Sequence, residues 1–134
     1  MSTYRVSEAA KLLGHSDDTM RRYIDSGRLE SSRDDAGRIV IEGVELARFA
    51  VDDASPVPGV QAVTRESARN RFVGLVTRVV SNDVMAQVEL QCGPYRVVSL
   101  MSREAADDLG LQPGVLAVAS IKATNVVVGI PADQ

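Results

Sequence analysis

Two short blocks of hydrogen-bond donors lie far apart in the second half of the chain. The first block, residues 67–70, reads Ser-Ala-Arg-Asn, and the second, residues 121–124, reads Ile-Lys-Ala-Thr. Together they supply two hydroxyls, a guanidinium, an amide and an ammonium. A small tetrahedral dianion offers only acceptor oxygens, so its site must combine donors with enough positive charge to offset its removal from water. The two blocks have that chemistry.

The stretch between the blocks has the period of half-buried strands. Ala86, Val88 and Leu90 alternate with Gln87 and Glu89, which is a repeat of two residues. Patterns of this kind predict strands at 71–80, 84–91, 95–101, 115–121 and 126–130 and a short helix at 103–109. Five short strands with one short helix favour an OB-like β-barrel.

Three motifs in this half follow one another in the order of a known family. They are Ser-Ala-Arg-Asn, the turn Leu-Gly-Leu-x-Pro-Gly at residues 109–114, and Ile-Lys-Ala-Thr. With them the chain resembles the Mop (molbindin-type, TOBE-like) domain, a barrel that binds molybdate or tungstate between paired copies.

The resemblance implies an oxyanion site that two subunits share. From one subunit it takes Ser67, Arg69, Lys122 and Thr124. From the neighbouring subunit it takes Ser102, which is expected to cap the short helix. The chain departs from the family at Ala105, where a second hydroxyl residue often stands, so one side-chain hydrogen bond to the anion is missing here.

Several of the predicted strands are apolar on both faces. In the first of them, Phe72 and Val76 alternate with Val73 and Leu75. A barrel of this size encloses only one of the two sets, and the other set would be exposed unless a second copy covers it. We therefore expect a homo-oligomer, either a dimer or a trimer of dimers.

The first fifty residues carry the pattern of a helix-turn-helix. Val6, Ala9, Ala10 and Leu13 stand at i, i+3, i+4 and i+7, which predicts the apolar stripe of a short helix that Ser7 caps and Gly14 ends. Ser16 is the expected cap of a second helix. Two helices joined by a short turn that contains glycine form this motif.

A wing and a third helix are expected to follow. Residues 30–41 predict a β-hairpin around the turn-prone 34–37, and residues 44–49 predict a helix beneath it. This order, with Val-Ser-Glu-Ala-Ala-Lys-Leu-Leu-Gly at 6–14 and Thr-Met-Arg-Arg-Tyr at 19–23, resembles the MerR/excisionase-like winged helix-turn-helix domain. The resemblance implies binding to double-stranded DNA.

By the same resemblance the second helix enters the major groove and the wing contacts phosphates. The implied DNA-binding residues are Thr19, Arg21 and Arg22 on the helix and Arg33 and Arg38 on the wing. Taken by its spacing alone, the face that these helix arginines share with Asp18 and Asp25 is typical of a solvated, salt-bridged surface. For His15, in the turn, an exposed or half-packed position is favoured over a phosphate contact.

Charge sets a limit on this interaction. Residues 1–50 contain eight Lys or Arg and nine Asp or Glu. Because neutralising phosphates supplies most sequence-independent affinity, one domain alone is expected to bind DNA weakly. Two or more copies acting together would compensate for that weakness.

The composition of the chain argues against several classes of protein and site. Cys92 is the only cysteine and His15 the only histidine, so no internal disulfide, zinc cluster or histidine-based triad is expected. We see no catalytic constellation and expect no enzyme and no directly ligated metal. The net charge of −3, the absence of a long apolar run and the polar N-terminus favour a cytoplasmic protein with no membrane partner.

The fold class expected is therefore α+β, with two domains. The winged helix-turn-helix is assigned to residues 1–50, a linker with Pro56 and Pro58 to 51–66, and the Mop/TOBE-like domain to 67–134. The combination indicates a molybdate- or tungstate-responsive transcription regulator. Two alternatives stay open, a molybdate storage or buffer protein and a DNA-binding factor whose barrel only oligomerises.

Overall fold

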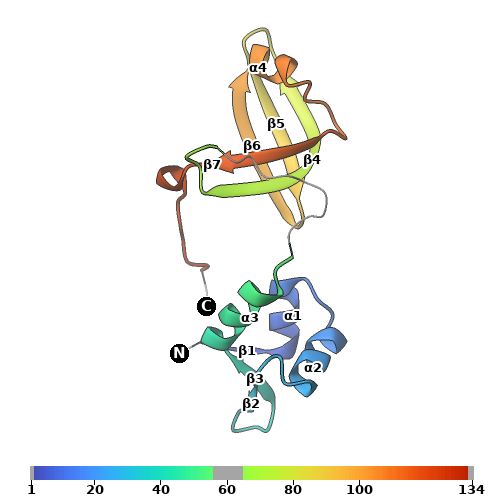
Figure 1. The fold of residues 1–134 in the computed structure, drawn as a ribbon, viewed down its shortest axis with the longest axis vertical. Helices are drawn as coiled ribbons and strands as arrows, with labels where there is room; N and C mark the ends of the chain where they lie inside the picture. The colour runs from blue at the N-terminus through green and yellow to red at the C-terminus, as the bar shows by residue number, and fades with distance from the viewer. Residues whose placement is uncertain (1, 56–64, 133–134) are drawn as a thin grey trace. The chain divides into compact units, whose positions relative to one another are not determined.

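The computed structural model describes residues 2–55 and 65–132, which form two compact units (Figure 1). Helices and an antiparallel sheet in the first unit, with a curled antiparallel sheet in the second, confirm the α+β class. Residues 56–64, most of the expected linker, lie outside the described residues. No helix within the described ranges is long and apolar enough to cross a bilayer.

The first unit is a helix-turn-helix with a wing. In chain order it contains β1 (Thr3–Arg5), α1 (Val6–Leu13), α2 (Asp17–Asp25), β2 (Ser32–Arg33), β3 (Ile39–Glu42) and α3 (Gly43–Asp53). Strands β2 and β3 form the hairpin expected at 30–41, and β1 pairs with the other edge of β3. Helix α3 continues past the expected domain boundary at residue 50.

The start of α1 differs from the prediction. Ser7 was expected to cap this helix, but the cap is Arg5, and Ser7 lies exposed within the first turn. The Glu8 carboxylate accepts a hydrogen bond from the Arg5 amide at 3.0 Å. Val6 is buried with the apolar face of α1, and this burial extends the helix to Val6.

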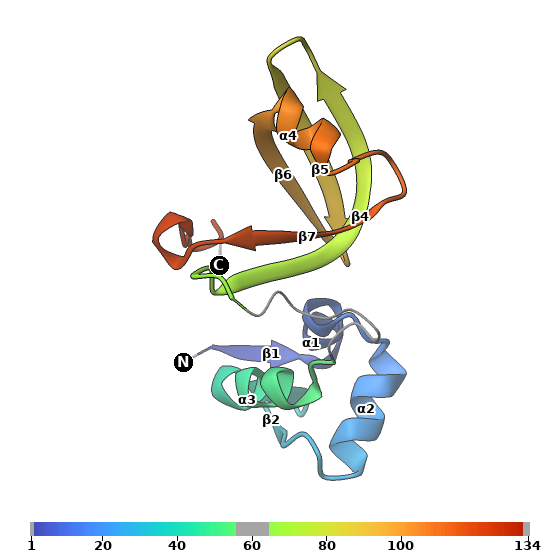
Figure 2. The same cartoon turned by 45° about the horizontal axis from the view of Figure 1, so that its top comes forward.

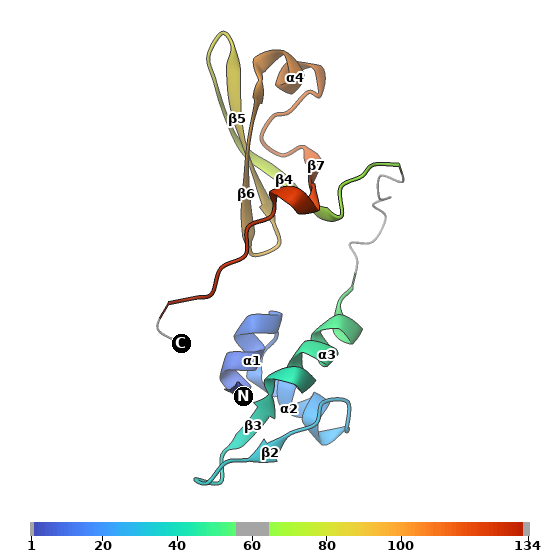
Figure 3. The same ribbon diagram turned by 90° about the vertical axis from the view of Figure 1, so that its left-hand side faces the viewer.

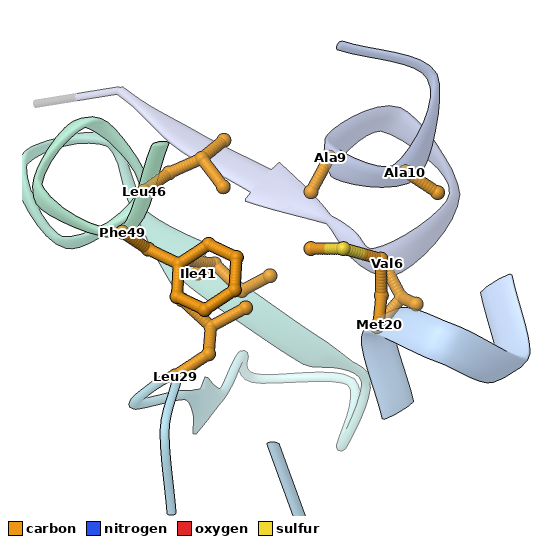
Figure 4. Close-up of a cluster of buried hydrophobic side chains, with 8 residues drawn as sticks. All are labelled: Val6, Ala9, Ala10, Met20, Leu29, Ile41, Leu46 and Phe49. Atoms are coloured by element: carbon orange, nitrogen blue, oxygen red, sulfur yellow. The ribbon is translucent and has the colours of Figure 1, made fainter. Parts of the chain in front are cut away.

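One cluster of apolar side chains joins all three helices to the sheet (Figure 4). Its buried members are Val6, Ala9, Ala10, Met20, Leu29, Ile41, Leu46 and Phe49. Because α1, α2, β3 and α3 each contribute to it, the position of α2 relative to the wing is fixed by packing.

The second unit is an open, curled sheet, the half-barrel form of the expected OB-like fold. It contains β4 (Asn70–Ser81), β5 (Met85–Cys92), β6 (Tyr95–Ser102), the helix α4 (Arg103–Asp108), β7 (Leu116–Ile121) and the 3₁₀ turn η1 (Ala123–Asn125). The strand order is β6-β5-β4-β7, and all neighbours are antiparallel. The two edge strands, β6 and β7, are not paired with each other.

Strand β4 belongs to two ladders in succession. Residues 70–75 pair with β7 and residues 75–81 pair with β5, so the strand curves strongly along its length (Figure 2). Gly74 lies at the crossing, and an added Cβ there would stand 2.4 Å from the Gln91 carbonyl oxygen and 2.6 Å from Cys92 Sγ. A glycine is needed because the backbone of β5 passes this close.

The strand predicted at residues 126–130 is wrong for the single chain. After η1 the chain leaves the sheet in an extended path without regular structure (Figure 3). Its apolar side chains are open to solvent, with Val127 at 93% and Val128 at 85% exposure. A strand needs a ladder partner, and the described part of the chain provides none for this segment.

Gly74→Ala should destabilise the second unit by about 1–3 kcal/mol, because the added methyl group meets backbone rather than a mobile side-chain end. Urea unfolding of the full chain, followed through the NMR amide signals of β4 and β5, measures this unit separately. Gly129→Ala is the matched control, since a Cβ at Gly129 has no atom within 4 Å. Equal unfolding midpoints for the two variants would contradict the close approach of β4 and β5.

Candidate functional site

The pairing of β4 with β7 brings the two donor blocks together. Asn70 is opposite Ile121 in the ladder, and the Asn70 side-chain amide donates to the Ile121 carbonyl at 3.2 Å. The first block therefore enters β4 beside the point where the second block leaves β7 (Figure 1). The residues gathered at this end of the half-barrel are Ser67, Arg69, Lys122 and Thr124, all of them exposed.

Arg69 and Lys122 carry the positive charge at this end of the half-barrel. Within residues 65–132 neither Arg69 nor Lys122 forms an ion pair; Arg69 makes only a long hydrogen bond to the Ser67 carbonyl at 3.5 Å. The nearest carboxylate in sequence, Glu66, is bound to Arg71 at 2.8 Å. Hydrogen bonds from Ser120 and Arg71 lower the pKa of Glu66, which keeps its charge tied to these two partners.

Ser102 lies elsewhere in the same chain. It is opposite Met85 at the end of β6, next to the end of β4 that is farthest from Asn70. Its hydroxyl oxygen accepts from the Ala105 amide at 3.1 Å, as expected for the cap of α4, and its own O–H stays available as a donor. One chain therefore brings together four of the five residues assigned to the anion, and not the fifth.

Helix α2 presents two arginines to solvent. Arg21 and Arg22 are exposed, and within residues 2–55 neither of them pairs with a carboxylate. The salt-bridged face that their spacing alone favours is thus not formed. Thr19 is half-buried and engaged, because its amide donates to Ser16 Oγ at 3.1 Å and its hydroxyl accepts from Arg22 at 3.2 Å.

The wing uses part of its charge to hold its own turn. Arg33 donates to the Gly37 carbonyl at 2.7 Å, and Arg38 pairs with Asp34 at 3.0 Å. The backbone amide of Arg38 is the main cause that lowers the pKa of Asp34. Asp34 is therefore a turn-forming residue whose charge is bound within the wing.

His15 faces the interior of the first unit. Its Nε2 lies 2.7 Å from Asp53 Oδ2, and its ring meets Tyr23 edge-on at 5.5 Å between centroids. Asp53 also lies 3.6 Å from Arg28, whose guanidinium stands 4.6 Å over the Tyr23 ring. These contacts agree with the half-packed position favoured for His15 and tie the helix-turn-helix turn to the end of α3.

Sequence reasoning missed Arg5. It ends β1, a strand too short to be predicted, and it lines the same hollow as Arg21 and Arg38. Cys92 is buried in β5, and burial raises the pKa of its thiol, so it is a packing residue rather than a nucleophile. Among the described residues no three His, Cys, Asp or Glu side chains are grouped in a way that would hold a metal ion.

Two family comparisons cover both units. Residues 3–50 match the family described as "Helix-turn-helix domain", and residues 66–128 match the family described as "TOBE domain". Both are binding-domain families rather than enzyme families.

Two curated relatives match a stretch of this chain over most of their own length, and a third matches over about a third of its length. The molybdenum-pterin-binding protein 3 of Clostridium pasteurianum is 38% identical over 63 residues, which cover 46% of this chain and 93% of that protein. A probable molybdenum-pterin-binding protein of Haemophilus influenzae is 40% identical over 65 residues, 48% of this chain and 94% of that protein. MopA of Rhodobacter capsulatus is 35% identical over 95 residues, 66% of this chain; there the chain spans only 34% of the relative.

A solved structure, the molybdate-binding protein from Sporomusa ovata, is 28% identical, with a TM-score of 0.48; the match covers 50% of this chain and 100% of that chain.

Proposed function

The chain belongs to the Mop family of molybdenum-pterin-binding proteins, and we propose that it is a molybdate- or tungstate-responsive DNA-binding transcription regulator. The TOBE domain binds the oxyanion and assembles the oligomer, and the helix-turn-helix domain binds double-stranded DNA. Such a regulator acts in the cytoplasm. One observation carries the proposal, the paired ends of β4 and β7, where two cations without an ion pair in residues 65–132 lie beside two hydroxyls.

Molybdate matches the chemistry of this end of the half-barrel. It carries two negative charges at neutral pH and has only acceptor oxygens. Arg69 and Lys122 offset its charge, and Ser67 and Thr124 add hydroxyl donors. The names of the relatives from Clostridium and Haemophilus, both described as molybdenum-pterin-binding, support a molybdenum-containing ligand.

A second copy completes the site. The four donors are open to solvent, so alone they hold the anion against full competition from water. Ser102 of a second copy closes the cage and contributes its free O–H, since the Ser102 of the same chain lies at the far end of β4. Because Ala105 lacks the hydroxyl that the family often has at this position, the Ser102 hydroxyl becomes more important for binding the anion.

The half-barrel supports the same arrangement. An apolar hollow of about 440 Å³ opens between the edge strands β6 and β7, with Val97, Leu111 and Val115 in its lining. Among the residues that the structure describes, the segment 126–130 has strand-forming side chains but no ladder partner, and one edge of β7 is unpaired. The occupant that fits is the 126–130 segment of a second copy, which makes the dimer the functional unit.

Dimerisation also serves DNA binding. The first unit is not basic overall, so each copy contributes few phosphate contacts. Two copies joined through their barrels bind neighbouring half-sites with an avidity that neither has alone.

Lys122→Ala should weaken molybdate binding to the full chain by roughly 10- to 100-fold, because it removes a charged hydrogen-bond donor from the anion. Isothermal titration with molybdate, tungstate and sulfate measures this loss and should show sulfate as the weakest of the three. Arg78→Ala is the matched control, since it removes one exposed positive charge from the second half of β4. Ala105→Ser should tighten binding. Equal isotherms for the Lys122 and Arg78 variants would place the anion elsewhere.

The full chain should be at least a dimer by light scattering at micromolar concentration. Replacing both Val127 and Val128 by Lys should shift it toward monomer without unfolding it, because these side chains are exposed in the single chain. The same double change at Val44 and Val51, which are 76% and 78% exposed on α3, should leave the oligomer intact. A monomeric wild type would refute the shared oxyanion site.

A further inference from the structure

A hollow of about 360 Å³ lies in the first unit where β1, α1, α2 and the wing meet. Arg5 comes from the end of β1, Arg21 from α2, and Arg38 from the wing, one residue before β3 begins. Ser7, in the first turn of α1, and Asp17, in the first turn of α2, complete its polar lining. Arginines drawn from three elements make this a concave, positively charged surface rather than a chance run of charge.

Most of this charge is uncommitted. Within residues 2–55 neither Arg5 nor Arg21 forms an ion pair. Arg38 gives its Nε to Asp34, which leaves its terminal N–H groups free to donate elsewhere. Three guanidinium groups and one carboxylate, Asp17, line the hollow. Two further carboxylates lie near it, each already bonded: Asp34 to Arg38 and Glu8 to the Arg5 amide.

We propose that this hollow binds one backbone phosphate of duplex DNA, through Arg5, Arg21 and Arg38 with the Ser7 hydroxyl. The inference rests on the proposed function, because it needs the first unit to bind DNA. A guanidinium fork matches the paired oxygens of a phosphodiester, and a concave site takes a compact anion better than the flat edge of a base.

Under this proposal the two arginines of α2, Arg21 and Arg22, have different roles. Arg21 lines the hollow and fixes the position of the domain on the backbone, whereas Arg22 does not line it and is left to reach the bases. It also adds Arg5 and Ser7 to the DNA-contacting surface.

The test measures the DNA affinity of the full chain by fluorescence anisotropy over a range of salt concentrations. Two duplexes are compared: one of mixed sequence, and one that carries a site obtained by selecting genomic DNA for binding to the wild type. Arg5→Gln should weaken binding to both duplexes by a similar factor, roughly tenfold. It should also reduce the slope of log affinity against log salt by about 0.9 per bound copy, the loss of one phosphate contact. If the hollow binds a free anion and no DNA phosphate, Arg5→Gln should keep the salt slope of the wild type.

Ser7→Asp separates binding from folding. A carboxylate in the first turn of α1 favours the helix but repels a phosphate in the hollow. This variant should keep or raise the thermal stability of the chain while weakening both duplexes. Lys11→Gln is the control for Arg5→Gln and Ser7→Asp, because each of the three changes makes the net charge more negative by one. Lys11 lies in the last turn of α1 and does not line the hollow.

The outcomes distinguish the two proposals. A wild type that binds neither duplex overturns the proposed function together with the phosphate site. A wild type that binds, with the Arg5 and Ser7 variants indistinguishable from the Lys11 variant, overturns the phosphate site alone. Loss of binding to the selected site only would make Arg5 a base-reading residue and would also overturn it.

Discussion

The antiparallel pairing of β4 with β7 is the interaction on which the second unit depends. It joins the first strand of the half-barrel to the last, and it places donors from residues 67–69 beside donors from residues 122–124. Its register is reinforced by the bond from Asn70 to the Ile121 carbonyl. The same strand then curves away to pair with β5, which Gly74 permits. Both the fold of the second unit and the grouping of its donor residues therefore depend on the β4–β7 ladder.

The half-barrel of a single chain is structurally incomplete in three ways. Its edge strands are unpaired with each other, its last apolar segment has no ladder within the described residues, and its fifth donor lies at the wrong end. In the dimer that we propose, a second copy meets all three requirements in one assembly. An oxyanion bound in that assembly lies where two chains meet, so its occupancy bears on how the two DNA-binding units are presented.

Sequence reasoning succeeded where local pattern decides structure. Alternation placed strands β4 to β7, and Ser16 and Ser102 were identified as caps that the structure confirms. It failed where tertiary contacts decide: burial of Val6 moved the start of α1, and the 126–130 segment has strand propensity without a partner. Arg5 was missed because only the folded sheet brings it beside Arg21 and Arg38, which are distant in sequence.

The central claim is that oxyanion and DNA binding are coupled, and one titration tests it most directly. The affinity of the full chain for its selected duplex is measured with and without saturating molybdate, and in parallel for Lys122→Ala. Screening limits direct repulsion between a bound dianion and DNA to roughly 8–10 Å, so a large effect requires a change in domain arrangement. We expect molybdate to change the DNA affinity of the wild type by roughly 5- to 150-fold, and Lys122→Ala to abolish this change. Identical affinities with and without molybdate would contradict it.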